Sequence, residues 1–395
     1  MRTALVNGRV LTATGFVDDL AVVIEGGHIV DVAPHKQAHS HREHDLQGRM
    51  LAPGFIDCQV NGGGGVLFND APTVETIQRI ARAHRRFGTT GLLPTLISDG
   101  ASTTREAVHS VAAAIEQGVA GVLGIHLEGP FLATQKKGIH DSTKFRLPDA
   151  ADVALIASGK SGRVVLTIAP EEVSTDVVRE LSNRGVIVVA GHTAASYEQT
   201  HAALAAGLRG FTHLFNAMSP LQSREPGVVG AALEDRNSWC GIIVDGHHVH
   251  PAALRVALHA KPRGKLFLVS DAMPPVGSSE PTFQLNGETI TCREGICTNS
   301  AGTLAGSALD MCSAVRNTVR MLEVDLPEAL RMASQYPAEF LGLGRTHGRI
   351  EIGYVADLVA LTDDFGVDDF VVDDISVDDI SVSETWCGGL HEAAL

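Results

Sequence analysis

The chain has 395 residues, of which 44% are hydrophobic and 19% charged, and its formal net charge is −15. This composition is typical of a globular protein with room for one large domain and a small companion, and the negative charge argues against a general nucleic-acid binder. We find neither a secretory leader pattern nor a run of about 18 apolar residues, so we expect a cytoplasmic protein without a membrane partner.

Both ends of the chain carry β-strand patterns. Alternating or β-branched residues separated by Asn-Gly and Gly-Gly turns occupy residues 4–12, 16–27, 28–34 and, near the other end, 347–362. Because the termini of a domain often lie close together, these segments can join in one unit. We therefore predict a small β-sandwich domain built from residues 1–50 and 345–395.

The middle of the chain alternates short apolar runs with helical patterns. The strand-like runs lie at residues 51–60, 90–96, 121–129, 163–170, 186–193, 210–217, 239–246 and 265–271. Helical periodicity is clearest at residues 73–88, 102–118, 196–207 and 251–260. This alternation predicts an α/β fold with a catalytic (β/α)8 TIM-like barrel at residues 51–344, and a doubly wound open sheet is the alternative.

Residues 281–299 follow the eighth strand and have the pattern of a β-hairpin, with Cys292 and Cys297 flanking its turn. The six cysteines of the chain form no CxxC pair. We therefore expect reduced, mostly buried thiols, with a disulfide or a metal role for Cys292 and Cys297 as the alternative. Helical stretches follow at residues 308–322 and 327–334.

An aspartate-rich near-repeat covers residues 363–382. Its few copies cannot build a solenoid. We expect a solvated strand edge or an insertion here. A calcium site is the alternative, although the repeat lacks the glycine and the ligand spacing of known calcium loops.

Polar residues gather at the carboxyl ends of the predicted barrel strands, which is where the active sites of such barrels lie. In strand order they are Gln59 and Asn61, His126 and Glu128, His192, His213, Asp245 with His247 and His248, and Asp271. A single histidine in a strand is usually a hydrogen-bonded core residue. Several at the same end of successive strands indicate a functional site instead.

The residue types at these strand ends suit metal-assisted hydrolysis. Glu128, His192 and His213 would give a divalent ion such as zinc three protein ligands and leave a position for water. The ion would lower the pKa of that water, and Asp271 is placed to take its proton and pass it to a leaving amine. His140, in the loop after the third strand, is a candidate second donor to the developing oxyanion.

At nine segments the chain resembles the N-acetylglucosamine-6-phosphate deacetylases, a family within the amidohydrolase superfamily. These segments are PGFIDCQVNGGGG, GIHLEGPFL, KKGIHD, AGHTAAS, THLFNAMSP, REPGVVG, VDGHHVHP, VSDAMPP and GTLAGSALDM. The resemblance runs from about residue 1 to residue 362, where GRIEIGYVADLV resembles the closing β-segment of the superfamily. HLEGPF, HLFNAM and REPG in this order are highly specific, whereas GHT alone is weak.

The resemblance implies roles for individual residues. Glu128, His192 and His213 match metal ligands, Asp271 matches the catalytic acid/base, and His140 matches the residue that polarises the substrate carbonyl. The substrate-binding positions that it implies are Ile139, His140, Asn216, Ala217, Arg224, His248 and Leu304, with Arg224 and His248 holding the 6-phosphate. The family is usually dimeric, which implies a homodimer in which Arg224 can reach the neighbouring site.

One departure from the wider superfamily predicts a single metal ion per chain. Many members carry His-x-His after strand one and a carboxylated lysine on strand four, which together bind a second ion. Here strand one ends in Gln59 and Asn61, which would hydrogen-bond a water, and strand four ends in Ala169-Pro170-Glu171. Zinc is the expected ion, and iron, manganese and cobalt also fit the donor set.

The implied reaction is hydrolysis of N-acetylglucosamine 6-phosphate to glucosamine 6-phosphate and acetate in amino-sugar catabolism or recycling. The same deacetylation of N-acetylgalactosamine 6-phosphate is an open alternative. The two sugars differ only in the configuration of one hydroxyl, and no motif in the sequence indicates which configuration is recognised. A cyclic-amide hydrolase and a non-catalytic phosphosugar-binding regulator are further alternatives. The first lacks support because the two-metal ligands are absent, and the second because the full set of Glu128, His192, His213 and Asp271 is present.

Overall fold

A computed structural model describes residues 2–362 and 380–393 of the chain. Eight parallel strands form the barrel, each hydrogen-bonded to the next in chain order. They are β6 (Phe55–Val60), β9 (Thr89–Ile97), β10 (Gly124–Glu128), β11 (Arg163–Ile168), β12 (Ile187–Ala190), β13 (Gly210–Phe211), β14 (Trp239–Ile242) and β15 (Leu266–Leu268). A parallel bridge between Val60 and Ala272 links the ends of the first and eighth strands. The predicted barrel is confirmed, and the open-sheet alternative is excluded.

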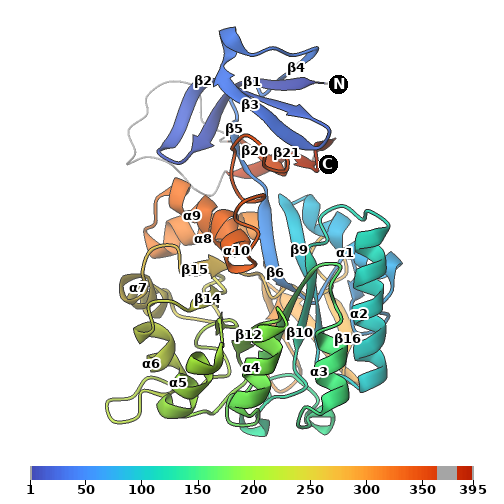
Figure 1. Ribbon diagram of the computed structural model, residues 1–395, viewed down its shortest axis with the longest axis vertical. Coiled ribbons are helices and arrows are strands. Elements are labelled where there is room, and N and C mark those ends of the chain that lie inside the picture. The colour runs from blue at the N-terminus through green and yellow to red at the C-terminus, as the bar shows by residue number, and fades with distance from the viewer. Residues whose placement is uncertain (1, 363–379, 394–395) are drawn as a thin grey trace.

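A helix follows each barrel strand and covers the outside of the barrel (Figure 1). The helices are α1 (Val74–Arg85), α2 (Ala101–Glu116), α3 (Ala150–Ile156), α4 (Thr175–Asn183), α5 (Tyr197–Ala206), α6 (Gly227–Glu234), α7 (Pro251–Ala260) and α8 (Met311–Leu322). Local sequence fixes several of their starts. Ser196 and Gln199 form a capping box at α5, and Asp149 and Asp152 form one at α3. Apart from Arg163 at the start of β11, the strands are buried along their whole length, as expected for a parallel sheet covered by helices.

Strands from both ends of the chain join in a second sheet. Its order is β22-β21-β20-β5-β1-β2-β3, with β4 pairing with β1. The strands are β1 (Thr3–Thr12), β2 (Gly15–Glu25), β3 (His28–Pro34), β4 (Arg42–Asp45), β5 (Met50–Pro53), β20 (Leu358–Thr362), β21 (Ser381–Cys387) and β22 (Leu390–Ala393). A 3-10 turn, η1 (His35–Gln37), follows β3. The first and last strands, β1 and β22, belong to the same sheet (Figure 1), and the domain boundaries at residues 50 and 345 stay a prediction.

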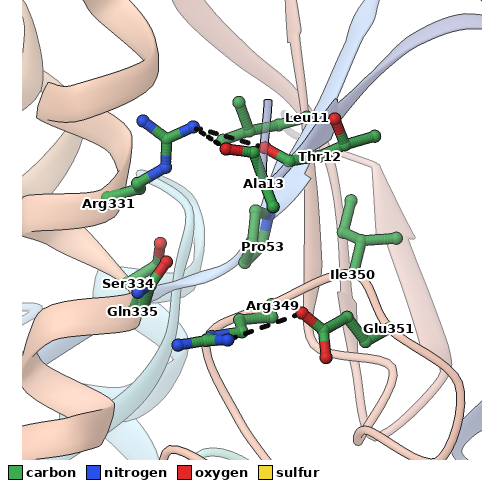
Figure 2. A pocket seen from close by; sticks show the side chains of 11 residues that line it. Leu11, Thr12, Ala13, Pro53, Arg331, Ser334, Gln335, Arg349, Ile350 and Glu351 are labelled. Atoms are coloured by element: carbon green, nitrogen blue, oxygen red, sulfur yellow. Dashed lines mark hydrogen bonds and ion pairs between the residues drawn. The ribbon is translucent and has the colours of Figure 1, made fainter. Parts of the chain in front are cut away.

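The small sheet lies at the amino-terminal end of the barrel strands, because Pro53 of β5 is separated from Phe55 of β6 by only one residue. The carboxyl ends of the barrel strands therefore face away from it. Helices α9 (Leu326–Ala333) and α10 (Gln335–Phe340) follow α8 beside the small sheet (Figure 1). Figure 2 shows the junction, where Arg331 donates hydrogen bonds to the carbonyl oxygens of Thr12 and Ala13 at 3.3 and 3.2 Å.

At the opposite, carboxyl-terminal end, a small antiparallel sheet follows β15. It consists of β16 (Thr282–Leu285), β17 (Glu288–Arg293), β18 (Ile296–Thr298) and β19 (Leu304–Ser307). The β17–β18 register places Cys292 opposite Cys297 with their Cα atoms 4.0 Å apart, and the two form a disulfide. The expectation of thiols was wrong for this pair, because cross-strand pairing brings the two side chains together. The other four cysteines are free and buried, as expected.

The remaining elements are short. Strands β7 (Gly62–Gly63) and β8 (Val66–Leu67) form a hairpin after β6, and the 3-10 turns η2 (Thr134–Lys136) and η3 (Ser142–Lys144) lie in the long loop after β10. Among the described residues, no helix is long and apolar enough to cross a membrane. The aspartate-rich stretch falls almost entirely on residues 363–379, which lie outside the described residues.

Candidate active site

The carboxyl ends of the barrel strands open into a cavity of about 510 Å³. Ten of the eleven predicted site residues line it, namely Glu128, Ile139, His140, His192, His213, Asn216, Ala217, His248, Asp271 and Leu304. The pocket at the domain junction in Figure 2 has only about 40 Å³, which is too small for a sugar phosphate. The cavity at the barrel mouth is therefore the candidate active site.

Three groups on successive parts of the barrel rim meet at one point. The Nε2 atoms of His213 and His192 lie 3.0 and 3.2 Å from Oε1 of Glu128, and 3.1 Å from each other. All three side chains are buried. Two imidazole nitrogens and one carboxylate oxygen packed this closely are a donor set that fits a borderline-soft divalent cation.

Hydrogen bonds orient these ligands. Nδ1 of His192 lies 2.9 Å from the carbonyl oxygen of Lys136. Because a carbonyl can only accept, Nδ1 carries the proton and Nε2 presents its lone pair to the centre of the site. Burial acts to raise the pKa of Glu128, but its close contacts with His192 and His213 outweigh this effect and hold the pKa well below its usual value. The carboxylate is therefore charged, as a cation ligand must be.

Asp271 is held by two amides from the end of the first strand. Its Oδ1 accepts a hydrogen bond from Asn61 Nδ2 at 2.7 Å and one from Gln59 Nε2 at 3.0 Å. Gln59 Nε2 also lies 3.2 Å from Glu128 Oε1, so it links the acid/base candidate to the ligand set. Burial, followed by the charge of Glu128, raises the pKa of Asp271, which brings it toward the range useful for proton transfer near neutral pH.

His140 enters from the loop after β10 and faces the other oxygen of the same carboxylate, with Nε2 4.0 Å from Glu128 Oε2. Its Nδ1 accepts a hydrogen bond from the backbone N–H of Ser98 at 3.3 Å, and the Ser98 hydroxyl lies 2.9 Å away. Burial lowers the pKa of His140 to about 3. The neutral ring therefore carries its proton on Nε2, where it can donate into the cavity.

His248 forms a second polar wall. Its Nδ1 lies 2.5 Å from Asp245 Oδ2, so Nδ1 donates to this carboxylate and Nε2 is left to contact a ligand. Burial acts to raise the pKa of Asp245, but the hydrogen bonds from His248 and His247 outweigh it and lower the pKa to about 2. Lys136, Asn216 and the backbone at Ala217 line the cavity as well.

Two positions predicted from the sequence, Arg224 and His126, lie away from the cavity, and Gln59, Asp245 and His247 do not line it either. Arg224 is exposed in the loop between β13 and α6 and does not line the cavity of its own chain. His126 was grouped with Glu128 at the end of the third strand, but it points into the barrel core, with Nε2 2.8 Å from Thr167 Oγ1. Burial, opposed by Glu128, lowers the pKa of His126 to about 4, so it is a neutral core residue.

Sequence reasoning missed Ser98, which fixes the ring of His140, and Lys136, which lies in the cavity wall. Lys136 belongs to the KKGIHD segment, so a signal for it was present. Ser98 follows the second barrel strand directly, and attention to that strand end would have found it. Sequence reasoning also missed that Gln59 and Asn61 both donate to Asp271, whereas their expected contact with a water stays a prediction.

Comparisons with known proteins agree with this geometry. Residues 50–379 match the model of the amidohydrolase family, and residues 3–51 match the NagA composite domain. An N-acetylgalactosamine-6-phosphate deacetylase of Shewanella is 42% identical over 90% of this chain and 91% of its own length. An N-acetylglucosamine-6-phosphate deacetylase of Haemophilus influenzae is 36% identical over 93% and 97%. The crystal structure of N-acetylglucosamine-6-phosphate deacetylase from Pasteurella multocida superposes with a TM-score of 0.92 at 34% identity, covering both chains completely.

Proposed function

The chain belongs to the amidohydrolase family, and from this premise we propose that it hydrolyses the acetamide bond of N-acetylglucosamine 6-phosphate, releasing acetate and glucosamine 6-phosphate. The observation that carries the proposal is the meeting of Glu128, His192 and His213 in the cavity that also holds Asp271 and His140. The cleaved bond is then a linear amide, and the pathway is the breakdown or recycling of amino sugars in the cytoplasm.

We propose that Glu128, His192 and His213 hold one divalent metal ion, with zinc the first choice and iron, manganese or cobalt also suited to the donors. The fit rests on the three ligand atoms, which lie within 3.2 Å of one another in a buried site. When bound, such an ion supplies Lewis acidity and lowers the pKa of water. In two-metal amidohydrolases, two histidines at the end of the first strand help to bind the second ion. This chain has Gln59 and Asn61 there, which supports one ion per chain.

The chain's own residues then carry the proton and the developing charge. Asp271 takes a proton from the water that attacks the acetamide carbon, and His140 Nε2–H donates to the carbonyl oxygen as it gains charge. Asp271 next gives its proton to the sugar nitrogen as the C–N bond breaks, so the amine leaves neutral and the water oxygen stays in acetate. The amides of Gln59 and Asn61 hold the carboxylate in one orientation for both transfers.

We propose that the phosphate end of the substrate binds at His248 and the backbone of Asn216 and Ala217, while Ile139 and Leu304 contact the sugar. Arg224 would complete the phosphate site from the neighbouring subunit of a homodimer. Two facts support this role: Arg224 is exposed, and it is absent from the cavity wall of its own chain. An arginine fork suits a phosphate because it donates two parallel hydrogen bonds.

The test is acetate release from N-acetylglucosamine 6-phosphate by protein of known metal content, run beside the unphosphorylated sugar. We expect fast release with about one ion per active site and a strong requirement for the phosphate. No release from metal-loaded protein on either sugar would overturn the proposal and point to another amide or to a binding protein.

The second candidate substrate is N-acetylgalactosamine 6-phosphate. The 42% identity with the Shewanella deacetylase of that name favours it. The two sugars differ in the configuration of one hydroxyl, so the chemistry at Asp271 would be the same. Comparing kcat/KM for the two epimers decides between them, and a value higher for the galacto sugar would replace the first candidate.

A further inference from the structure

A second cluster of metal-binding side chains lies in the small sheet, at the end of the molecule opposite the active site. His44 comes from β4, near the start of the chain, whereas Glu384 and His391 come from β21 and β22, near its end. The ligand atoms of these three residues all lie within 4.8 Å of one another. Nothing in the proposed hydrolysis uses this cluster.

The geometry repeats that of the active-site ligands. Nε2 of His44 and Nε2 of His391 lie 2.7 and 2.6 Å from the same oxygen of Glu384, Oε2. The contact from His44 lacks the geometry of a hydrogen bond, so its buried Nε2 has no hydrogen-bond partner. His391 Nε2 does have hydrogen-bond geometry to the same oxygen. A His44 nitrogen that faces this carboxylate oxygen and the second imidazole without a hydrogen bond of its own is available to a cation.

Neighbouring side chains fix the three ligands in place. Arg49 donates to the other oxygen of Glu384 at 2.5 Å, which leaves Oε2 directed at the imidazoles. The Trp386 ring stacks on His391 with a centroid distance of 5.0 Å and meets His44 edge-on at 5.4 Å. Such outer contacts hold metal ligands in orientation. Arg49 also brings a positive charge, which weakens cation binding and is consistent with a site of lower affinity than the active site.

The sequence carries an independent signal at the same place. Residues 35–44 hold four histidines, at positions 35, 39, 41 and 44, and short histidine-rich tracts are typical of metal-binding segments. Only His44 of this tract joins the cluster. His35, in the same tract, lies 3.5 Å from Glu43 and is not part of the cluster. It therefore offers a matched control for His44 and His391.

We propose that His44, Glu384 and His391 bind one divalent cation of the zinc, nickel, copper or cobalt class, which clips the first and last segments of the small sheet together. Three protein ligands leave coordination positions for water, and the two imidazoles favour these ions over magnesium or calcium. Because β4 and β22 lie far apart along the chain, a bound ion stabilises the sheet by joining its two ends.

The test is metal stoichiometry of the full-length protein, measured by equilibrium dialysis against fixed free Zn²⁺ followed by metal analysis. We expect His391→Ala to bind about one ion per chain fewer than the wild type, with unchanged acetate release. His391 is on the final strand and its side chain is 41% exposed, so this change should not prevent folding. His35→Ala is the matched control and should keep the wild-type stoichiometry.

A second readout uses Trp386, one of only two tryptophans in the chain. Cu²⁺ bound beside its ring should quench tryptophan fluorescence in the wild type and in His35→Ala, but much less in His391→Ala. The test compares metal binding in His391→Ala with that in the wild type and His35→Ala, all of which share the same active site. Its outcome therefore does not depend on whether the active-site proposal is correct. Equal stoichiometry in the wild type and His391→Ala, or equal loss in His35→Ala, would mean that the cluster is only an ionic network around Arg49 and Glu384.

Discussion

A buried carboxylate in the first barrel strand should make the stability of this protein depend on pH. Asp57 is fully buried in β6 and accepts backbone hydrogen bonds from Gln59 at 3.1 Å and Ser270 at 3.2 Å, as well as one from the Ser270 hydroxyl. Burial raises the pKa of Asp57 to about 7, and the bonds from Ser270 and Gln59 offset this only in part. In the unfolded chain an aspartate has a pKa of about 3.9.

The sign and size of the effect follow from these two values. Between pH of about 4 and 7 the folded state binds a proton at Asp57 that the unfolded state has lost, so stability falls as pH rises through this window. Three pKa units at 1.36 kcal/mol each correspond to about 4 kcal/mol in total. Roughly 3 kcal/mol of this falls between pH 5 and pH 8.

Asp57→Asn should remove this dependence. An asparagine can keep the two backbone bonds at Oδ1, and its Nδ2 can donate to the Ser270 oxygen, whose hydroxyl lies 3.4 Å from the Gln59 carbonyl. The thermal unfolding midpoint of the variant minus that of the wild type should therefore be a few degrees larger at pH 8 than at pH 5. Asp18→Asn, at a side chain that is 78% exposed, is the control and should track the wild type. A constant difference between Asp57→Asn and the wild type at both pH values would refute the reasoning.

Three further predictions concern the proposed reaction. Asp271→Asn should keep the metal content but lower kcat about 10³-fold, because proton transfer is lost while Gln59 and Asn61 can still hold the side chain; near-normal turnover would remove Asp271 from its role. Ser98→Ala should lower kcat about fivefold with unchanged metal content, since the hydroxyl beside His140 is worth about 1 kcal/mol and the Ser98 backbone N–H remains; unchanged kcat would show that the hydroxyl does not position the ring. Arg224→Ala should raise KM for the phosphorylated substrate about tenfold or more, and mixing it with Asp271→Asn should restore activity; no recovery in mixed dimers would place Arg224 in its own chain's site.

The barrel could be predicted because its signals are local. Most of the barrel strands are short, buried runs, and most of the helices that follow begin at a residue whose side chain caps them, as at Ser196 of α5. The helix after β13 was unclear from sequence because α6 is apolar on all sides and starts without a side-chain cap. The Cys292–Cys297 pairing depends on cross-strand register, which the sequence left open between a disulfide and thiols.

The candidate site could be predicted where residues lie at or just beyond strand ends, as Glu128, His192, His213 and Asp271 do. Contacts between side chains from different strands were harder to predict from the sequence. Gln59 and Asn61 lie at the correct end of the barrel, but their partner is Asp271, more than 200 positions away in the chain. His126 could not be told from a site residue by its position in the sequence. It lies in the core, whereas Glu128, two residues further along the same strand, is at a proposed ligand position.

Backbone conformation at the rim explains why strand ends alone do not define the site. His192, His213 and Asp271 all adopt positive φ angles of 48°, 29° and 53°, and none is a glycine. Such conformations cost of the order of 1–3 kcal/mol each and persist only where the surroundings enforce them. Each of the three lies just beyond its strand with a positive φ angle, and its side chain lines the cavity. The backbone strain at these positions is therefore a structural cost of bringing the proposed ligands and the proposed acid/base together.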